Sequence, residues 1–488
     1  MLFNTITFAV FSPIVFLLYW FVFQRNLKLQ NFFIVVASYV FYGWWDWRFL
    51  LLIAFTSLCS WVCGLLIQHT DNQQDKQLFS RKFISISNIV LNLGILGIFK
   101  YYNFFVESFI SAFASIGINL QLHTLKLILP IGISFYTFQA LSYSIDVYKR
   151  KIEPTKDIVA FFAYIGFFPL LVAGPIERAT NLLPQFYKKR TFDYKNAVDG
   201  VRQILWGLFK KIVVADNCAT YVNTIFENPQ DQTGSALLLG AVFFAFQIYG
   251  DFSGYSDIAI GVARLFGINA MRNFAYPYFS RDIAEFWRRW HISLTTWFRD
   301  YVYIPLGGSR VSKAKIVRNT FIIFLVSGFW HGANCTFIVW GAFHALLFLP
   351  LILFNQNRKY TNTVAEGRNF PNIKEIFQMG VTFLLVVIGW VFFRADSIEM
   401  AFEYFIDMID RSLIYLPPTD RIRIFKCLFF VLCMLSVEWI QRGKQHGLET
   451  FGFGWNKYLR YFFYLTLAFI ILIVNLRGRG HDFIYFQF

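Results

Sequence analysis

The residues best suited to chemistry are two histidines in an otherwise apolar run from Phe324 to Pro350, His331 and His344. An ionisable side chain at membrane depth is a functional-site hypothesis by default. Around His331 the apolar pattern is interrupted by small or polar residues, namely Ser327, Gly328, Gly332, Ala333 and Asn334. They predict a helix break, and irregular backbone is tolerated at that depth only where protein or a water-filled cavity satisfies it. His331 is therefore the first candidate for a functional residue.

A third histidine, His291, lies in a segment whose helical periodicity predicts one helix from Arg281 to Tyr301. One face of this helix carries Trp287, Trp290, His291, Leu294, Trp297 and Phe298. The other face carries Glu285, Arg288, Arg289, Thr295, Thr296 and Arg299. Aromatic residues opposite arginines are typical of a helix that lies at the membrane interface rather than crossing it. On the apolar face, His291 is either a hydrogen-bonded packing residue or a catalytic residue.

The composition indicates whether these histidines lie in water or in a membrane. Of the 488 residues, 57% are hydrophobic and 15% are charged, whereas an average soluble domain has about 25% charged residues. Apolar runs long enough to cross a bilayer recur along the chain. The fold class predicted is an all-α polytopic membrane protein with about eleven transmembrane helices plus interfacial and re-entrant helices. No linker separates a soluble part, so one membrane domain over residues 1–488 is expected.

The net charge of +16 is distributed as a membrane topology requires. Basic residues gather in links between apolar runs, at Arg25 to Lys28, Lys149 to Lys156 and Lys188 to Arg190, which the positive-inside rule assigns to the cytoplasm. The N-terminus is expected outside, because the first basic cluster follows the first apolar run. This distribution argues for membrane lipids as partners and against a nucleic acid.

Familiar catalytic and metal-binding spacings are missing from the sequence. It contains no HExxH, P-loop, GxSxG or CxxC pattern, so metal, nucleotide and serine-hydrolase chemistry lack support. Several polar residues in apolar segments are expected to pair with each other or with backbone groups: Gln139, Asp146, Glu177, Arg178, Asp251 and Asp257.

An ordered set of motifs resembles the membrane-bound O-acyltransferase family, in its bacterial alginate O-acetyltransferase and D-alanyl-lipoteichoic-acid transferase branch. The motifs are FYGWWDWRF from Phe41, ISFYTFQALSYSIDVY from Ile133, FFPLLVAGPIER from Phe167, YGDFSGYSDIAIG from Tyr249, EFWRRWHISLTTWFRDYVYIPLGGSR from Glu285, GFWHGANCTFIVWGAFHALL from Gly328, GWVFFRA from Gly389 and the terminal FIYFQF. Each motif alone is moderately specific, whereas their joint order is very specific.

The resemblance implies acyl transfer to a hydroxyl, with the family's catalytic histidine at His331 and its second motif histidine at His291. A neutral imidazole can accept the proton of a hydroxyl that attacks a thioester carbonyl. The stretch VYIPLGGSR after Tyr301 looks like the acetyltransferase branch. It implies acetyl-CoA as donor, no permanently bound cofactor, an exported polysaccharide or cell-wall polymer as acceptor, a periplasmic or extracellular SGNH-type partner, and a bacterial inner-membrane location.

Two alternatives and one binding question remain open at this stage. A D-alanyltransferase would use the same chemistry with a carrier protein as donor, and a non-catalytic channel would move an acyl group without breaking a bond. Arg288, Arg289 and Arg299 could bind the phosphates of coenzyme A by charge-assisted hydrogen bonds or anionic lipid headgroups.

Overall fold

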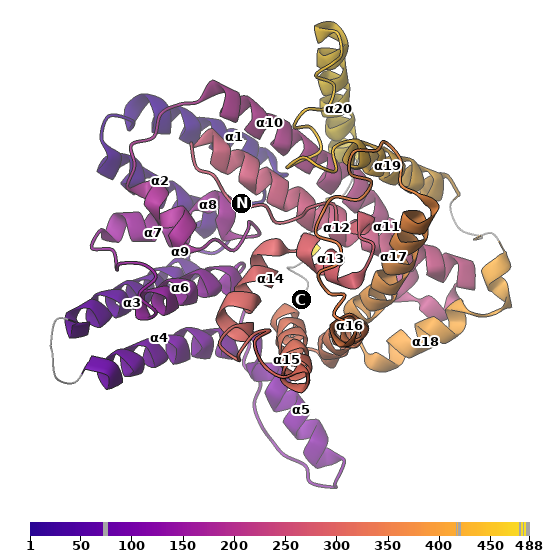
Figure 1. Ribbon diagram of the computed structural model, residues 1–488, viewed down its shortest axis with the longest axis horizontal. Helices are drawn as coiled ribbons and strands as arrows, with labels where there is room; N and C mark the ends of the chain where they lie inside the picture. The colour runs from indigo at the N-terminus through magenta and orange to yellow at the C-terminus, as the bar shows by residue number, and fades with distance from the viewer. Residues whose placement is uncertain (72–76, 416, 418–420, 478–479, 482, 485–488) are drawn as a thin grey trace. The chain divides into compact units, whose positions relative to one another are not determined.

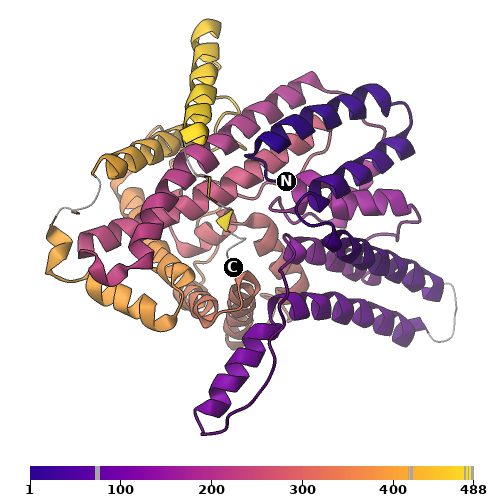
Figure 2. The same ribbon diagram turned by 180° about the vertical axis from the view of Figure 1, so that it is seen from behind.

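The computed structural model describes residues 1–71, 77–415, 417, 421–477, 480–481 and 483–484 of the chain (Figures 1 and 2). Within these residues the regular structure is entirely helical, which confirms the predicted fold class. The chain divides into two compact units, one of Met1–Val198 with Val262–Met271 and one of Asp199–Gly261 with Arg272–Phe488. Each unit is described by itself, and the expectation of one domain stays a prediction.

The first unit consists of helices of very different lengths. Asp157 caps one of them, because its carboxylate accepts hydrogen bonds from the N–H groups of Val159 and Ala160, both at 3.0 Å. The elements are α1 Ile6–Leu17, η1 Leu18–Val22, α2 Leu27–Gly43, α3 Arg48–Asp71, α4 Gln77–Lys100, α5 Tyr102–Ala114, α6 Ile133–Tyr148, α7 Ile158–Gly166, α8 Phe168–Leu171, α9 Ala179–Leu182 and η2 Leu183–Phe186. Helix α10, Tyr194–Leu208, continues into the second unit.

The second unit holds every histidine singled out from the sequence. Its elements are η3 Phe209–Ala215, α11 Asp216–Glu227, η4 Pro229–Asp231, α12 Gly234–Leu265, η5 Pro277–Phe279, α13 Ile283–Arg289, α14 Ile292–Phe298, η6 Arg299–Tyr303, α15 Lys313–His331, α16 Cys335–Leu353, α17 Ile373–Arg394, α18 Ile398–Met408, η7 Arg411–Ile414, α19 Arg421–Ile440 and α20 Lys457–Arg477. The last residues of α12, from Val262, belong to the first unit.

Six helices of the described chain are long and apolar enough to cross a membrane. They are Arg48–Thr70, Ser80–Lys100, Gly234–Leu265, Cys335–Leu353, Ile373–Arg394 and Lys457–Leu476. The protein is thus a multi-pass membrane protein, whereas the expected number of about eleven spans stays a prediction. Other apolar helices, such as Ile6–Val22, are shorter.

Helices α15 and α16 form a tight hairpin around the predicted break. Helix α15 ends at His331, Gly332 is extended, and Asn334 caps α16 by accepting a hydrogen bond from the N–H of Thr336 at 3.0 Å. Glycines let the two backbones approach, because a Cβ at Gly328 would lie 2.2 Å from the carbonyl oxygen of Phe337. The structure therefore confirms the predicted helix break.

The prediction of one continuous helix from Arg281 to Tyr301 is wrong. The segment forms α13, α14 and the π-helical η6, and the chain bends between α13 and α14 at Trp290 and His291. His291 has φ 43° and ψ 54°, a left-handed conformation that interrupts any α-helix. Periodicity did not reveal the bend, because the aromatic residues on both sides of it face the same core.

Protein rather than lipid covers the aromatic face of this segment. The rings of Trp287 and Phe324 lie 5.3 Å apart, and those of Trp290 and Trp390 lie 5.0 Å apart. The partners belong to α15 and α17, and all three tryptophans of the segment, Trp287, Trp290 and Trp297, are buried. The expected contact of the aromatic face with lipid is therefore corrected to packing inside the second unit, while the position of the segment at the membrane interface stays a prediction.

Candidate active site

The imidazole of His331 is enclosed by aromatic rings at the end of α15. Its centroid lies 4.9 Å from Trp330, 5.2 Å from Trp340 and 5.3 Å from Phe393. The side chain is buried, although the backbone after it is not helical. The helix break thus places a titratable ring among aromatic side chains, at the position that the sequence singled out.

The second motif histidine faces the first. The ring centroids of His291 and His331 lie 6.5 Å apart, and Phe252 of α12 packs edge-on against His291 at 4.6 Å. Burial lowers the pKa of His291 to about 3, so this imidazole is neutral near pH 7. Its left-handed backbone costs about 1–3 kcal/mol for a residue other than glycine, which the surrounding structure must offset.

Two imidazoles in an apolar shell are suited to proton transfer. A neutral ring accepts a proton on one nitrogen, and the low polarity around it strengthens each electrostatic interaction with a reacting group. Within the described residues, no group of three His, Cys, Asp or Glu side chains is arranged to hold a metal ion. The arrangement supports general acid–base chemistry by the chain's own side chains.

The sequence also singled out His344. Its ring packs against Trp340, the same tryptophan that the ring of His331 contacts. Its ring centroid is 5.0 Å from Trp340 and 5.0 Å from Trp287. The side chain is completely buried, and a Cβ at Gly389 would lie 2.9 Å from its Nε2 atom. His344 is therefore part of the aromatic packing of α13, α16 and α17.

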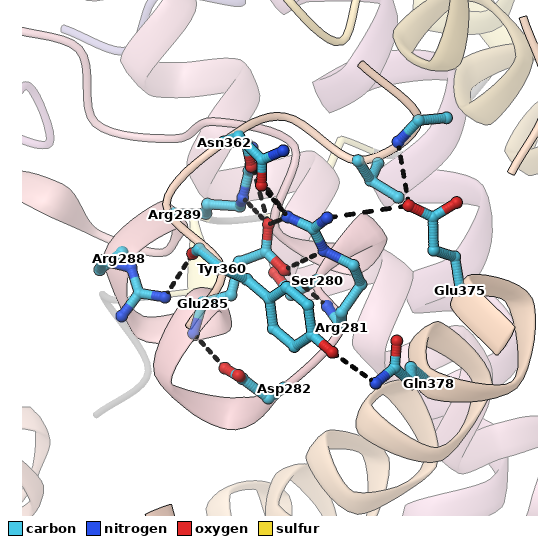
Figure 3. A network of polar contacts seen from close by, with 12 residues as sticks. Ser280, Arg281, Asp282, Glu285, Arg288, Arg289, Tyr360, Asn362, Glu375 and Gln378 are labelled. Carbon is cyan, nitrogen blue, oxygen red and sulfur yellow. Dashed lines mark hydrogen bonds and ion pairs between the residues drawn. The ribbon is translucent and has the colours of Figure 1, made fainter. Parts of the chain in front are cut away.

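Glu285 of α13 is a buried carboxylate that holds Arg289 of the same helix and Arg281, which lies just before it (Figure 3). Glu285 accepts hydrogen bonds from Nε of Arg281 at 3.0 Å and from Nη2 of Arg289 at 2.8 Å, and its side chain is buried. Arg289 also donates to the carbonyl oxygens of Ala275 at 3.2 Å and Asn362 at 3.0 Å. Glu285, which periodicity placed on the solvent face, is thus the centre of a buried ion network.

Arg288 and Arg299 are more accessible than Arg289. Arg288 is exposed and donates to the carbonyl oxygen of Asn357 at 2.8 Å. It also donates to that of Tyr360 at 2.6 Å (Figure 3). Arg299 pairs with Asp300 at 2.8 Å, and its side chain is 59% exposed. A phosphate could approach these two guanidinium groups, whereas Arg289 would have to exchange internal partners. The assignment of all three to a donor phosphate stays a prediction.

Two lysines are the partners of Asp251 and Asp257, and the sequence had not identified them. Lys210 lies 2.6 Å from Asp257, and Lys211 lies 2.7 Å from Asp251. Both lysines belong to the π-helical η3, which packs on α12. A Cβ at Gly250 would lie 2.9 Å from the carbonyl oxygen of Lys210, so a glycine of α12 lets these two backbones approach. Two adjacent lysines in an apolar stretch gave no signal for this contact.

The described part of the C-terminus reaches the same region. Lys211 donates to the carbonyl oxygen of His481 at 3.0 Å, and the N–H of Ile484 donates to Asp251 at 2.7 Å. The ring of Phe483 lies 6.0 Å from Phe252, the residue that packs on His291. Residues 485–488 of the terminal motif lie outside the described residues.

In the first unit, two of the other buried polar residues have identified partners. Glu177 accepts hydrogen bonds from the side chain of Asn181 at 2.7 Å and from the N–H of Met271. Asp146 pairs with Lys151 at 3.3 Å. These contacts agree with the expectation that such residues pair internally, and the sequence could not have specified Met271.

Fold and site together define a multi-pass, all-helical membrane protein with a buried pair of histidines at a helix break. The model of the membrane-bound O-acyltransferase family matches residues 41–392, which include both histidines, and the chain belongs to this family. It is therefore a membrane O-acyltransferase.

Relatives with related activities match from about half of the chain to all of it. The chain is 39% identical to the probable alginate O-acetylase AlgI of Pseudomonas aeruginosa over 394 residues, covering 81% of this chain and 72% of that protein. It is 31% identical to the peptidoglycan O-acetyltransferase of Helicobacter pylori, covering 100% and 98% of the two chains. The teichoic acid D-alanyltransferase of Bacillus subtilis is 30% identical, covering 48% of this chain and 62% of that protein.

Proposed function

We propose that this enzyme transfers acetyl groups from cytoplasmic acetyl-CoA to hydroxyls of an exported polysaccharide or cell-wall polymer. The observation that carries the proposal is the burial of His331 at a helix break, 6.5 Å from a second imidazole. Relatives that are named as O-acetylating enzymes support the acetyl group and the polymer. A bacterial inner-membrane location with the N-terminus outside completes the proposal.

In the proposed mechanism, His331 is the general base. Its neutral imidazole accepts the proton of the acceptor hydroxyl while the oxygen attacks the thioester carbonyl. The carbon–sulfur bond then breaks, and the imidazolium returns its proton to the departing thiolate. The balance is one thioester and one hydroxyl giving one ester and one thiol. His291 contributes a neutral imidazole that orients the reacting groups, and no permanently bound cofactor takes part.

Acetyl-CoA is the donor in this scheme, and its polar nucleotide stays on the cytoplasmic side. Arg288 and Arg299 are the accessible cations for its phosphates, whereas Arg289 is held by Glu285. Only the acetyl group passes His331, through a tunnel that meets a shallower outer cavity. The hydroxyl that takes the acetyl group at His331 belongs to a periplasmic or extracellular SGNH-type partner, whose ester is then broken as the acetyl group passes to a hydroxyl of the polymer.

The main alternative is D-alanyl transfer from a carrier protein to a teichoic-acid-like polymer. The D-alanyltransferase relative of Bacillus subtilis covers 48% of this chain, whereas the O-acetylating relatives cover 81% and 100%. This difference in coverage favours acetyl transfer. A non-catalytic acyl channel is the second alternative, and it would not need a base at His331.

The test combines product analysis with one substitution. Mass spectrometry of cell-surface polymers, with and without the gene, should show an acetyl shift, and a D-alanyl shift would contradict the acetyl assignment. His331→Gln should lower transfer by about 10² to 10⁴-fold, because an amide cannot replace a base. Thermal stability of the purified variant serves as the folding control. Near-normal turnover would exclude general-base catalysis and favour a conduit.

A further inference from the structure

The chain reverses direction at His291 with a backbone conformation that the residue itself does not favour. Helix α13 ends at Arg289, Trp290 is extended, and His291 is left-handed with φ 43°. Non-glycine residues keep such a conformation only where surrounding contacts determine it. The contacts that hold the backbone of His291 in place therefore also fix where its imidazole lies.

Backbone hydrogen bonds hold the chain on both sides of the bend at His291. The N–H of Ala275 donates to the carbonyl oxygen of Arg289, and the N–H of Ile292 donates to the carbonyl oxygen of Asn273, both at 2.9 Å. The segment from Asn273 to Ala275 thus runs alongside the bend. These two bonds fix the positions of the residues before and after His291.

The side chain of Asn273 adds a link to helix α12. Its Nδ2 donates to Oγ of Ser256 at 3.1 Å, while its Oδ1 accepts from the N–H of Ser293 at 3.3 Å and from its Oγ at 2.9 Å. All three residues are buried. The N–H of Ser293 can only donate, so the oxygen of the amide must face α14 and its nitrogen must face α12.

Ser256 lies one helical turn after Phe252, whose ring packs edge-on against His291 at 4.6 Å. One face of α12 therefore contacts the imidazole through Phe252 and its supporting backbone through Ser256 and Asn273. The amide of Asn273 thus links Ser293, at the start of α14, to α12, the helix that packs against His291.

We propose that Asn273 is a positioning residue that holds His291 in its left-handed conformation and keeps its imidazole opposite His331. The proposal rests on the acyl-transfer function proposed above. Without the amide, the backbone at His291 can relax toward φ below zero, and the imidazole moves away from its place 6.5 Å from His331. A displacement of about 1 Å in a catalytic arrangement lowers a rate by about 10²-fold.

The first experiment measures transfer kinetics with purified protein, acetyl-CoA and a hydroxyl acceptor. Asn273→Leu keeps the backbone bonds and the approximate volume but removes the amide. We expect kcat per folded molecule to fall by about 10- to 100-fold, with KM for acetyl-CoA changed less than about twofold. Ser256→Ala removes only the hydrogen bond between Asn273 and α12, so a smaller fall in kcat is expected.

Asn319→Leu is the matched control. Asn319 is also a buried amide in the second unit, and it donates to the carbonyl oxygen of Leu306 at 3.1 Å from helix α15. Its loss should lower thermal stability without changing kcat per folded molecule. An equal fall in kcat for both variants, or no fall for Asn273→Leu, would overturn the proposal.

A double-mutant cycle in stability tests the same inference without any activity. Glycine adopts the left-handed conformation without strain. Asn273→Leu should therefore lower the unfolding temperature less in a His291→Gly background than in the wild type. Additive changes would mean that Asn273 does not act through His291. If the wild type itself transfers no acetyl group, the proposed function fails, while this cycle still decides the positioning role.

Discussion

At the scale of single residues, the aromatic rings around His331 set a limit on the group that can react there. Trp340 and Phe393 lie 5.2 and 5.3 Å from the imidazole, and both are buried. An acyl group bound beside His331 must fit among these rings. The size of the transferred group is therefore expected to depend on side chains that take no part in proton transfer.

Replacing Trp340 by alanine should make longer acyl donors relatively better substrates. We expect the ratio of kcat/KM for propionyl-CoA to that for acetyl-CoA to rise by about tenfold, since a methylene in a fitted pocket is worth about 1–3 kcal/mol. The ratio is independent of the folded fraction, because both donors report on the same molecules. Trp206→Ala is the control, a buried tryptophan packed on Phe209 at 5.2 Å, and an equal change in its ratio would contradict the assignment.

Because the carboxyl group of Glu177 is buried, we expect the stability of the protein to depend on pH. Burial raises its pKa from 4.5 to about 7, despite hydrogen bonds from Met271 and Asn181 that oppose the shift. The folded protein therefore retains a proton between about pH 4.5 and 7 that the unfolded chain has lost. In this window the free energy of unfolding falls as pH rises, by about 3 kcal/mol in total.

Glu177→Gln removes this titration. In detergent, the unfolding temperature of the variant minus that of the wild type should increase as pH rises from about 4.5 to 7, and should then stay level. Thermal unfolding scans at a series of pH values measure the difference. A difference that does not change with pH would show that the carboxyl group titrates normally in the folded state.

At the scale of elements, close helix packing depends on single glycines. Gly328→Ala would place a methyl group 2.2 Å from the carbonyl oxygen of Phe337 in the α15–α16 hairpin. Because neither backbone can move without disturbing the break at His331, we expect a loss of about 1–3 kcal/mol. Gly380→Ala in α17 is the matched control, since nothing lies within 4 Å of the added Cβ. It should gain about 0.5–1 kcal/mol. Thermal unfolding of both variants in detergent tests the pair, and similar destabilisation by both would contradict the packing argument.

At the scale of the whole molecule, charge topology and chemistry together predict a direction of transfer. The cytoplasmic assignment of Arg25 to Lys28, Lys149 to Lys156 and Lys188 to Arg190 places the donor inside, and the proposed acceptors are outside. In oriented proteoliposomes with acetyl-CoA inside and a hydroxyl acceptor or the partner protein outside, acetylation should appear outside. Free coenzyme A should accumulate inside. Product that forms only when donor and acceptor share one side would exclude transfer across the membrane, although the enzyme could remain an acyltransferase.

The sequence by itself determined the features that depend on local pattern or composition. Apolar runs predicted an all-helical membrane protein, and the small residues around His331 predicted the helix break. Both predictions hold because hydropathy and helix capping act over a few neighbouring residues: Gly332 is extended and Asn334 caps the next helix. Ordered motifs predicted the family in the same way, since motif order is written directly in the chain.

Only the tertiary structure decided how the parts of the site meet. The left-handed bend at His291 depends on Asn273 and α12, and the burial of Glu285 depends on Arg281 and Arg289. A helical wheel placed Glu285 on the same face as Arg289, as their contact confirms, but it could not show that the distant Asn362 also packs against this face. Lys210 and Lys211 meet their aspartates across about 40 residues of sequence, as close helix packing permits. Such pairings are chosen by long-range packing and desolvation, which local spacing does not encode.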